Sequence, residues 1–523
     1  MDALKGQRRS ERMALVRSRD TGPELAFRRA IWAAGFRFRV CDARLPGKPD
    51  VVFARQRVAV FIDGDFWHGG QWRRRKLSSL DDQFREAENA GYWRTKIRRT
   101  IERDFRRTSA MLDAGWTVLR FWESDLGRNL ERCVKMTVAA LKQDAKQTPN
   151  SAVAHRTVGE FFAGIGLVRV ALESRGWNVA FANDIDPKKA SIYADNFGDD
   201  HLALADIHSL DAIALPDCAL FTASFPCNDL SVAGGRAGLE GKSSSAFWGL
   251  IRILKELGER RPPLVLLENV IGFLNSHEGR DFETALVALN KLGYCCDAMA
   301  LNASSFAPQS RARLFVIAKQ LRLAAPCGIV PPCAVRPQAL ADFINSHPDI
   351  NWDIRRLPAP PQSGVRLPEI LEDLADDDPA WWNSERTEYF MNQLSDRHRA
   401  LADEMIAGAT PTFATAFRRV RKGRSMAELR TDGIAGCLRT PRGGSGRQIL
   451  FKAGLGRYQV RLLTARECAR LQGVPETFKI DVPLNQALFG FGDAVCVPVI
   501  EWIVDNYLTP AASELLRGRA LVE

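Results

Sequence analysis

Paired cysteines, a leader-like segment and a long apolar run are all missing from this chain of 523 residues. The eleven cysteines contain no CxxC pair, and the adjacent Cys295 and Cys296 lack the spacing of a zinc site. We therefore expect reduced and mostly buried thiols. The charged stretch 1–20 has no apolar core and predicts no secretory leader.

The longest apolar run, Ala494 to Val504, is interrupted by Pro498 and Glu501 and falls short of a membrane span. We expect a cytoplasmic protein with no membrane partner.

Positive charge is concentrated in the first part of the chain. Residues 1–145 contain 31 Lys and Arg against 19 Asp and Glu, a net charge of +12, whereas the whole chain carries +11. The basic clusters alternate with aromatic residues, as in 72–76 and 92–94. This pattern favours a polyanion-binding surface over a solvated basic face.

The chain is long enough for about three domains. Residues 143–155 lose apolar periodicity and collect Gln, Pro, Asn and Ser, which predicts a linker. Before it, predicted helices at 23–34 and 97–108 and strands at 51–54, 58–62 and 117–122 form a compact α/β unit. After it, alternating strands and helices over 157–319 predict a doubly wound, mostly parallel sheet.

From 320 to about 460 the sequence is richer in Pro and Gly and predicts a smaller inserted domain, after which a helix-forming tail is expected to pack back on the sheet. The predicted division is 1–143, a linker at 144–155, a catalytic domain at 156–320, an inserted domain at 321–460 and a closing segment at 461–523.

A thiol and a carboxylate follow two predicted strands of the second half. Pro226-Cys227 comes after a short apolar run, and Glu268-Asn269-Val270 comes after another. Carboxyl ends of parallel strands meet at the ligand-binding edge of such sheets. A nucleophilic thiol beside a carboxylate suits attack on an electron-poor ring, whereas either residue alone is more often a buried thiol or a turn residue.

Six motifs of this half occur in register with DNA cytosine-5 methyltransferases, which residues 156 to about 510 therefore resemble. The motifs are Phe162 to Gly166, Pro226 to Ser231, Glu268 to Val270, Gln309 to Arg313, Arg461 to Pro475 and Gly492 to Val499. The resemblance implies a Rossmann-like fold that uses S-adenosylmethionine, with 321–460 as a target-recognition domain. Two positions depart from the family pattern, Cys437 in place of Thr and Asp493 in place of Asn.

The resemblance also implies roles for individual residues. Cys227 would add to carbon 6 of a flipped cytosine, Glu268 would hold ring nitrogen 3, and Arg311 and Arg313, at alternate strand positions, would face the base, a phosphate or Glu268. The implied cofactor residues are Phe162, Gly164, Gly166, Asp184, Ile185, Asp206 and Pro226. Gln309 and Arg439 are predicted to contact DNA.

Residues 10–125 are similar to very-short-patch repair endonucleases. The matching motifs are Asp20 to Glu24, Leu45 to Asp50, Phe61 to His68, Tyr92-Trp93 with Lys96, and Gly115-Trp116 with Trp122-Glu123. The resemblance implies a restriction-endonuclease-like α/β domain that uses Mg²⁺, a cation that prefers oxygen ligands. No zinc is expected, because the positions of the family's zinc ligands read Asp65, Gly70, Trp72 and Ser124.

The implied nuclease centre contains Asp50 as the main metal ligand and the Ile62 carbonyl as a second. Asp63 replaces a common His and is either a ligand or a water-positioning group, His68 is an acid/base or phosphate contact, and Glu24 is a supporting residue. Met13, Phe66 and Trp67 correspond to residues that wedge into the base stack.

Together the two resemblances predict a bifunctional bacterial enzyme acting on double-stranded and T:G-mismatched DNA, nucleoid-associated when bound, with the mismatch-repair machinery as a candidate partner. Two alternatives stay open: a single-chain restriction and modification enzyme, and a methyltransferase with an inactive nuclease-like DNA clamp. The sequence does not indicate the recognition site or the oligomeric state.

Overall fold

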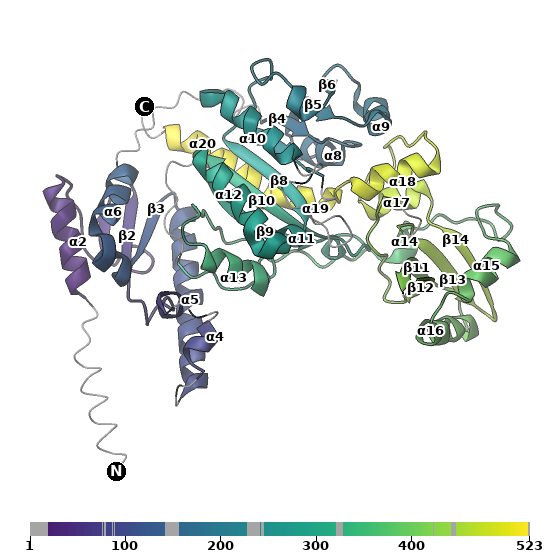
Figure 1. Ribbon diagram of the computed structural model, residues 1–523, viewed down its shortest axis with the longest axis horizontal. Coiled ribbons are helices and arrows are strands. Elements are labelled where there is room, and N and C mark those ends of the chain that lie inside the picture. The colour runs from purple at the N-terminus through teal and green to yellow at the C-terminus, as the bar shows by residue number, and fades with distance from the viewer. Residues whose placement is uncertain are drawn as a thin grey trace, which may run out of the picture.

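A computed structural model of the chain describes residues 19–75, 77, 80–85, 87, 89–141, 156–226, 241, 245–320, 328–421, 423–440 and 446–520. These residues form three sheets, which Figure 1 shows side by side with helices packed around them.

The first sheet has the strand order β1-β2-β3 and lies in the N-terminal unit. Strand β1 (Val51–Phe53) pairs antiparallel with β2 (Val58–Asp63), which pairs in parallel with β3 (Thr117–Trp122). Every residue of β1 and β2 is buried, because helices cover both faces of the sheet with their apolar sides.

Two longer helices and one of intermediate length cover this sheet. Helix α2 (Gly22–Ala33) and α6 (Glu123–Leu141) pack on one face through Phe27, Ile31 and Leu126. Helix α5 (Ala90–Asp113) lies on the other face, where Met111 meets Ala59, Phe61 and Val118. The short helices α3 (Gln71–Arg74) and α4 (Leu80–Gln83) precede α5.

The central sheet has seven strands in the order β6-β5-β4-β7-β8-β10-β9. Its first five strands pair in parallel, and β10 runs antiparallel to both neighbours. The strands are β4 (Thr157–Phe161), β5 (Asn178–Asp184), β6 (Leu202–Leu204), β7 (Leu220–Ala223), β8 (Leu264–Val270), β9 (Tyr294–Asn302) and β10 (Ala312–Gln320). The alternating strands and helices of the sequence thus give the doubly wound sheet that was predicted.

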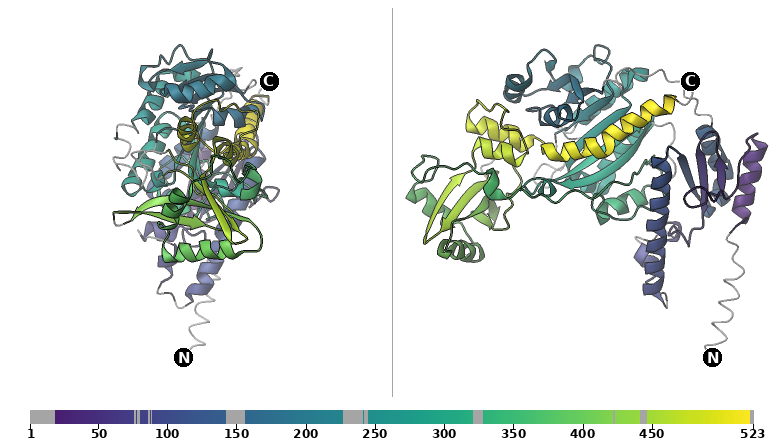
Figure 2. Two further views of the ribbon diagram at one scale, coloured as in Figure 1. Left: turned by 90° about the vertical axis from the view of Figure 1, so that its right-hand side faces the viewer. Right: turned by 180° about the vertical axis from the view of Figure 1, so that it is seen from behind.

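Two layers of helices enclose this sheet. One face is covered by α8 (Leu167–Glu173), α19 (Val497–Ile503), the π-helix η6 (Val504–Leu508) and α20 (Thr509–Ala520). The other face is covered by α10 (Ala246–Glu256), α11 (Gly272–Asn275), α12 (Arg280–Lys291) and α13 (Gln338–Ser346). The prediction that the C-terminal tail returns to the sheet is confirmed, and Figure 2 shows α19 and α20 running along it.

The third sheet forms the lobe at the far side of the central sheet from the first unit (Figure 1). It has the antiparallel order β12-β11-β13-β14, built from β11 (Thr412–Arg421), β12 (Arg424–Arg430), β13 (Ile449–Gly454) and β14 (Arg457–Leu462). Helices α15 (Ser384–Met391) and α16 (Asp396–Ala407) pack on it. Helices α17 (Ala465–Leu471) and α18 (Leu484–Asp493) follow. The remaining α-helices of the described residues are α9 (Pro187–Phe197) and the short α14 (Leu367–Ile370).

One stretch of consecutive helices, Leu484–Leu516, is long and apolar enough to cross a membrane by length and composition. Of its most apolar window, 67 % is buried inside the described part of the chain. This is the behaviour of core helices, in agreement with the packing of α19 and η6 on the sheet.

Candidate functional site

The loop 162–166, between β4 and α8, contains two glycines and forms one end of a cavity. Phe162 has a positive φ of 56°, a conformation that is costly for a residue with a side chain and is common at binding sites. The Gly164 N–H and the Asp186 N–H donate to the two carboxylate oxygens of Asp184, at 2.7 and 2.8 Å. Asp184 therefore fixes the loop and the turn after β5 at the same edge of the sheet.

The cavity has a volume of about 480 Å³ and lies at the carboxyl ends of the parallel strands. Six of the seven residues implied as cofactor contacts line it: Phe162, Gly164, Asp184, Ile185, Asp206 and Pro226. Glu268, Arg311 and Arg313 line the same cavity. The structure thus brings the two predicted functional groups of residues together in one space.

Gly166 is the exception among the implied cofactor residues. It does not line the cavity; an added Cβ would meet the Phe197 ring at 2.4 Å and the Tyr193 ring at 2.9 Å. Because its φ is also 83°, a glycine is required there for packing and for backbone conformation. The structure therefore corrects the cofactor interpretation of Gly166.

Asp206 combines a structural and a lining role. Its carboxylate accepts the His208 N–H at 2.9 Å and caps the 3₁₀ helix η1 (Ile207–Ser209), and it also lines the cavity. The cap leaves lone pairs of the carboxylate available for a bound group.

Glu268 and Arg313 face each other inside the cavity. The Arg313 Nε lies 2.9 Å from the Glu268 Oε1, and the side chains are 15 % and 10 % exposed. The residues come from β10 and β8, whose register pairs Arg313 with Val270, two positions from Glu268. The ion pair orients the Glu268 carboxylate toward whatever occupies this end of the cavity.

Asn269 holds the backbone that leads to the predicted nucleophile. Its Nδ2 donates to the Phe225 carbonyl at 3.1 Å, one residue before Pro226. Cys227 itself lies outside the described residues.

Arg311 lies just before β10 and has different hydrogen-bond partners from Arg313. It is buried and donates to the carbonyls of Leu438, Gly492 and Ala494 at 2.7, 3.1 and 2.6 Å. Its guanidinium thus joins the loop between β12 and β13 to the end of α18. Because Arg311 lines the cavity together with Arg313, a role of both arginines at this side of the cavity stays a prediction.

The DNA-contact interpretation of Gln309 is also wrong. Gln309 is completely buried, donates to the Leu471 carbonyl at 3.0 Å and accepts the Leu438 N–H at 3.2 Å. Its amide satisfies backbone groups inside the protein. Arg439, which directly follows the buried Leu438, is exposed and stays a predicted DNA contact.

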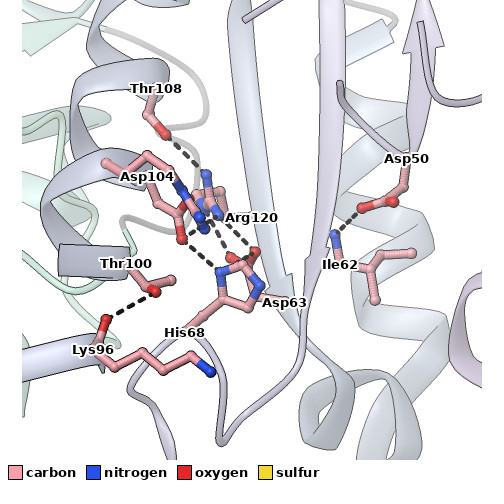
Figure 3. A network of polar contacts seen from close by, with 10 residues as sticks. Asp50, Ile62, Asp63, His68, Lys96, Thr100, Asp104, Thr108 and Arg120 are labelled. Atoms are coloured by element: carbon pink, nitrogen blue, oxygen red, sulfur yellow. Dashed lines mark hydrogen bonds and ion pairs between the residues drawn. The ribbon is translucent and has the colours of Figure 1, made fainter. Parts of the chain in front are cut away.

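The predicted nuclease residues occupy the carboxyl end of β2. The Asp50 carboxylate accepts the Ile62 N–H at 2.8 Å (Figure 3), and Glu24 accepts from Arg28 at 2.8 Å. Arg28 also donates to the Asp50 carbonyl at 3.4 Å. Burial, with the charges of Glu24 and Asp63, raises the pKa of Asp50 to about 6.

Asp63 and His68 belong to a second polar network on the other side of β2 (Figure 3). Arg120 donates to both carboxylate oxygens of Asp63, at 2.6 and 2.7 Å, and to the Thr108 hydroxyl at 3.1 Å. The His68 Nδ1 donates to Asp104 at 2.6 Å and lies 3.4 Å from Asp63. Asp63 is thus engaged by Arg120, and its oxygens do not face Asp50.

Charge balance sets the protonation of this network. Burial lowers the pKa of His68, but the hydrogen bond to Asp104 and the charge of Asp63 outweigh burial, so the net shift is upward. Burial raises the pKa of Asp104, but His68 and Arg120 outweigh it, so the net shift is downward. His68 therefore tends to carry a proton, held in place by a carboxylate.

Sequence reasoning missed Asp104 and Arg120. The signals were present: Asp104 occupies the helical face that also carries Ile97 and Ile101, and Arg120 interrupts the otherwise apolar strand Thr117–Trp122. A charged residue in a buried strand needs a partner, and Asp63 was the available carboxylate.

Aromatic residues form a cluster next to this network. The rings of Phe66 and Trp67 lie 5.3 and 6.0 Å from that of Trp93, and the Lys96 ammonium lies 5.4 Å from the Trp67 ring. Phe66 and Trp67 are half-buried, so their wedge role stays a prediction. Met13 lies outside the described residues.

Comparison with known proteins matches a family profile to each half of the chain. The family profile described as C-5 cytosine-specific DNA methylase matches residues 156–508. The chain belongs to this family. The profile described as DNA mismatch endonuclease Vsr matches residues 1–74.

Relatives match each half separately. The Type II nicking enzyme V.NmeDIP of Neisseria meningitidis serogroup C is 39 % identical over 142 residues, 27 % of this chain and 91 % of the relative. The Type II methyltransferase M.HhaI of Haemophilus parahaemolyticus is 27 % identical over 350 residues, 66 % of this chain and 92 % of the relative. The solved structure of the S. pombe Dnmt2 methyltransferase aligns with 68 % of this chain and 98 % of its own, at 21 % identity and a TM-score of 0.47.

This cytosine-5 methylase therefore also carries a Vsr-type endonuclease domain at its N-terminus, and the two families make the chain a bifunctional enzyme that acts on DNA. S-adenosylmethionine is the methyl donor expected for the methylase family. Within the described part of the chain, no three His, Cys, Asp or Glu side chains are grouped to hold a metal ion.

Proposed function

We propose that the chain methylates carbon 5 of a cytosine flipped out of a specific duplex site, and nicks DNA beside the thymine of the T:G mismatch that deamination of 5-methylcytosine produces. The observation that carries the first activity is the single cavity shared by the glycine loop, Asp184 and the Glu268–Arg313 pair. The Vsr match and the His68–Asp104 pair support the second.

The donor set of the larger cavity fits S-adenosylmethionine. Asp184 and Asp206 offer carboxylates to hydroxyl and amine donors, and Gly164 leaves space beside the backbone, since an added Cβ there meets nothing closer than 4.0 Å. Phe162, Ile185 and Pro226 supply apolar lining. The bound cofactor supplies an electrophilic methyl group.

The protein residues prepare the cytosine ring. Cys227, as a thiolate, forms a bond to carbon 6, and Glu268 holds ring nitrogen 3 while negative charge develops. Methylation at carbon 5 is followed by loss of the carbon 5 proton to water and by elimination of the Cys227 thiolate. Because a paired base cannot enter the cavity, the cytosine must leave the stack.

The nuclease residues fit a hard cation in part. The Asp50 carboxylate and the Ile62 carbonyl would hold Mg²⁺, which commonly completes its octahedron with water and substrate phosphate. Bound Mg²⁺ would stabilise the charge on the scissile phosphate. Asp63 does not fit as a ligand, because Arg120 holds both of its oxygens. We assign His68 as the group that gives a proton to the departing oxygen, and Glu24 as support through Arg28.

The proposed division of labour follows the predicted boundaries, with the nuclease in 1–143, methyl transfer in 156–320 and 461–523, and sequence readout in 321–460. The structure departs from these boundaries at two places, since α13 and its flanking residues pack on the central sheet and β14 crosses the boundary at 460. Arg439, Met13, Phe66 and Trp67 are proposed DNA contacts. The proposed location is the cytoplasm, on the nucleoid.

The experiment starts with the recognition site, identified by bisulfite sequencing of DNA from cells expressing the chain. Oligonucleotides carrying that site are then offered with Mg²⁺ as a T:G mismatch, as unmethylated duplex and as methylated duplex. We expect nicking of the mismatch alone. Cleavage of unmethylated duplex at a comparable rate would replace the proposal with a restriction and modification enzyme.

Two variants separate the activities. Cys227→Ser should lose methyl transfer and keep nicking, and Asp50→Ala should lose nicking and keep methyl transfer. If wild type binds the mismatch but never nicks it, the first domain is a DNA clamp.

A further inference from the structure

A short segment of the methyltransferase half lies against the nuclease half. Ile329, 9 % exposed, belongs to the same apolar cluster as Phe84, Ile97 and Ile101 of the first domain. In the reverse direction, Phe105 of α5 packs against the core cluster of the central sheet. Figure 1 shows α5 standing between the first sheet and the central domain.

The same segment closes the polar network around Arg120. A cavity of only about 20 Å³ remains between the two halves where they touch. Its lining includes Asp63, His68, Asp104 and Arg120 from the nuclease half, and Gly328, Ile329 and Ile354 from the other half. A Cβ added to Gly328 would lie 3.4 Å from the Arg120 Nε. The backbone of the methyltransferase half thus lies directly over the guanidinium.

The segment is itself held firmly in the methyltransferase half. The Val330 N–H donates to the Asn345 Oδ1 at 2.8 Å, and the Asn345 Nδ2 donates to the Val330 carbonyl at 2.9 Å. Ile354 lies between Asp353, which pairs with Lys319 at 2.6 Å, and Arg355, which pairs with Glu514. These bonds make the segment a rigid wall for α5.

Such a wall changes the electrostatics of the nuclease network. Arg120 and Asp63 are 6 % and 5 % exposed, and Asp104, which holds the His68 ring, is 13 % exposed. Ion pairs and hydrogen bonds shielded from water are stronger and better oriented than hydrated ones. Removal of the wall would admit water to Arg120 and Asp104 and would free the His68 ring to rotate.

We infer that the methyltransferase half forms the inner wall of the nuclease centre, and that Gly328, Ile329 and Ile354 act as positioning residues for nicking. The inference rests on the proposed nicking function. It makes the nuclease centre a property of the fused chain, because the docked surface of α5 is matched by a segment of the other half.

The test uses the full chain with Ile329→Asp, which places a carboxylate among Phe84, Ile97 and Ile101. Ile213→Asp is the matched control, since Ile213 is on the same half and is 75 % exposed. We expect Ile329→Asp to lower kcat for nicking a T:G duplex by about tenfold or more, with KM for that duplex and methyl transfer near wild type. Ile329→Val should restore nicking.

Hydrogen exchange of α5 provides a readout independent of nicking. We expect faster exchange over 97–108 in Ile329→Asp and wild-type exchange in Ile213→Asp. Wild-type kcat and protected α5 in Ile329→Asp would overturn the inference, as would equal loss of nicking in both Asp variants. If wild type does not nick a mismatch, the proposed function fails. The comparison of α5 hydrogen exchange between wild type and Ile329→Asp then still shows whether the methyltransferase half protects α5.

Discussion

At the scale of single residues, Glu160 is a buried carboxyl group of the methyltransferase half. It lies on β4 under the glycine loop, is 1 % exposed, and neither carboxylate oxygen has a hydrogen-bond partner of normal geometry in the described chain. Burial raises the pKa of Glu160 to about 8 from an ordinary value of 4.5, against the opposing charge of Arg169. The side chain is therefore mainly neutral at pH 7.

This shift predicts a pH-dependent stability. The unfolded chain releases the Glu160 proton near pH 4.5 and the folded chain near pH 8, so the free energy of unfolding decreases as pH rises between these values. Glu160→Gln should remove that decrease, and at high pH its gain over wild type should be on the order of 4 kcal/mol. Denaturant unfolding at several pH values measures it, with the exposed Glu259→Gln as control. Parallel curves for wild type and Glu160→Gln would contradict the prediction.

The Asp63–Arg120 pair gives a second prediction at this scale. Arg120→Met leaves Asp63 as an unpaired buried charge and should destabilise the first domain by about 3–5 kcal/mol. The double variant Asp63→Leu/Arg120→Met should recover much of that lost stability. Its nicking should stay low, because the charged groups that surround His68 and Asp104 are gone. Thermal unfolding and a nicking assay distinguish the two effects. Equal stability of Arg120→Met and wild type would show that the pair contributes nothing.

The same pair marks the limit of sequence reasoning about residues. Asp50, Glu268 and Asp184 could be predicted because motif spacing and strand ends constrain them. For Asp63 the sequence offered only a hint, a charged residue in the buried strand 117–122, because the parallel register of β2 and β3 that places Arg120 beside it is a tertiary property. Gln309 failed for a related reason: a polar residue in a motif satisfies buried backbone as readily as it contacts DNA.

At the scale of elements, Arg311 joins three segments that lie far apart in the chain. Its guanidinium binds carbonyls from the loop after β12 and from the end of α18, next to the start of β10. A planar fork with five donors suits this arrangement, and a lysine ammonium cannot reach all three carbonyls.

Arg311→Lys should therefore lower methyl transfer by about tenfold or more without affecting nicking, since the lost bonds are buried and charge-assisted. Arg260→Lys is the matched control, because Arg260 also binds two carbonyls, those of Ile213 and Leu215, away from the cavity. Transfer of labelled methyl groups to the recognition duplex is the measurement. Equal methyl-transfer rates for the two variants would show that the hydrogen bonds of Arg311 to the three carbonyls are not needed for methyl transfer.

Elements were the most predictable part of the fold. Strand β3 matches its predicted range, α2 is shifted by one residue toward the N-terminus, and β2 is one residue longer than predicted. Their apolar periodicity is strong because both faces of the first sheet are buried. The order β12-β11-β13-β14 could not be read from the sequence, since β13 pairs with β11 and not with β12, the strand that precedes it in the chain.

At the scale of the whole molecule, charge is divided unequally between the two activities. Residues 1–145 carry +12 and the remainder −1. Affinity for DNA that depends on phosphate contacts falls steeply with salt. Between about 50 and 200 mM salt we expect binding of mismatched DNA to weaken more than binding of the methylation duplex. Fluorescence anisotropy with both oligonucleotides measures the slopes, and equal slopes would contradict the prediction.

The docking of Ile329 into the first domain has a consequence for how such a chain can change over generations. If the proposed function and the inferred wall hold, loss of the second half by an early stop would also lower mismatch nicking, so that methyl transfer could not be lost alone. Among related fused chains, the residue at position 328 and the residues of α5 should then covary, because they lie on the two sides of one domain interface.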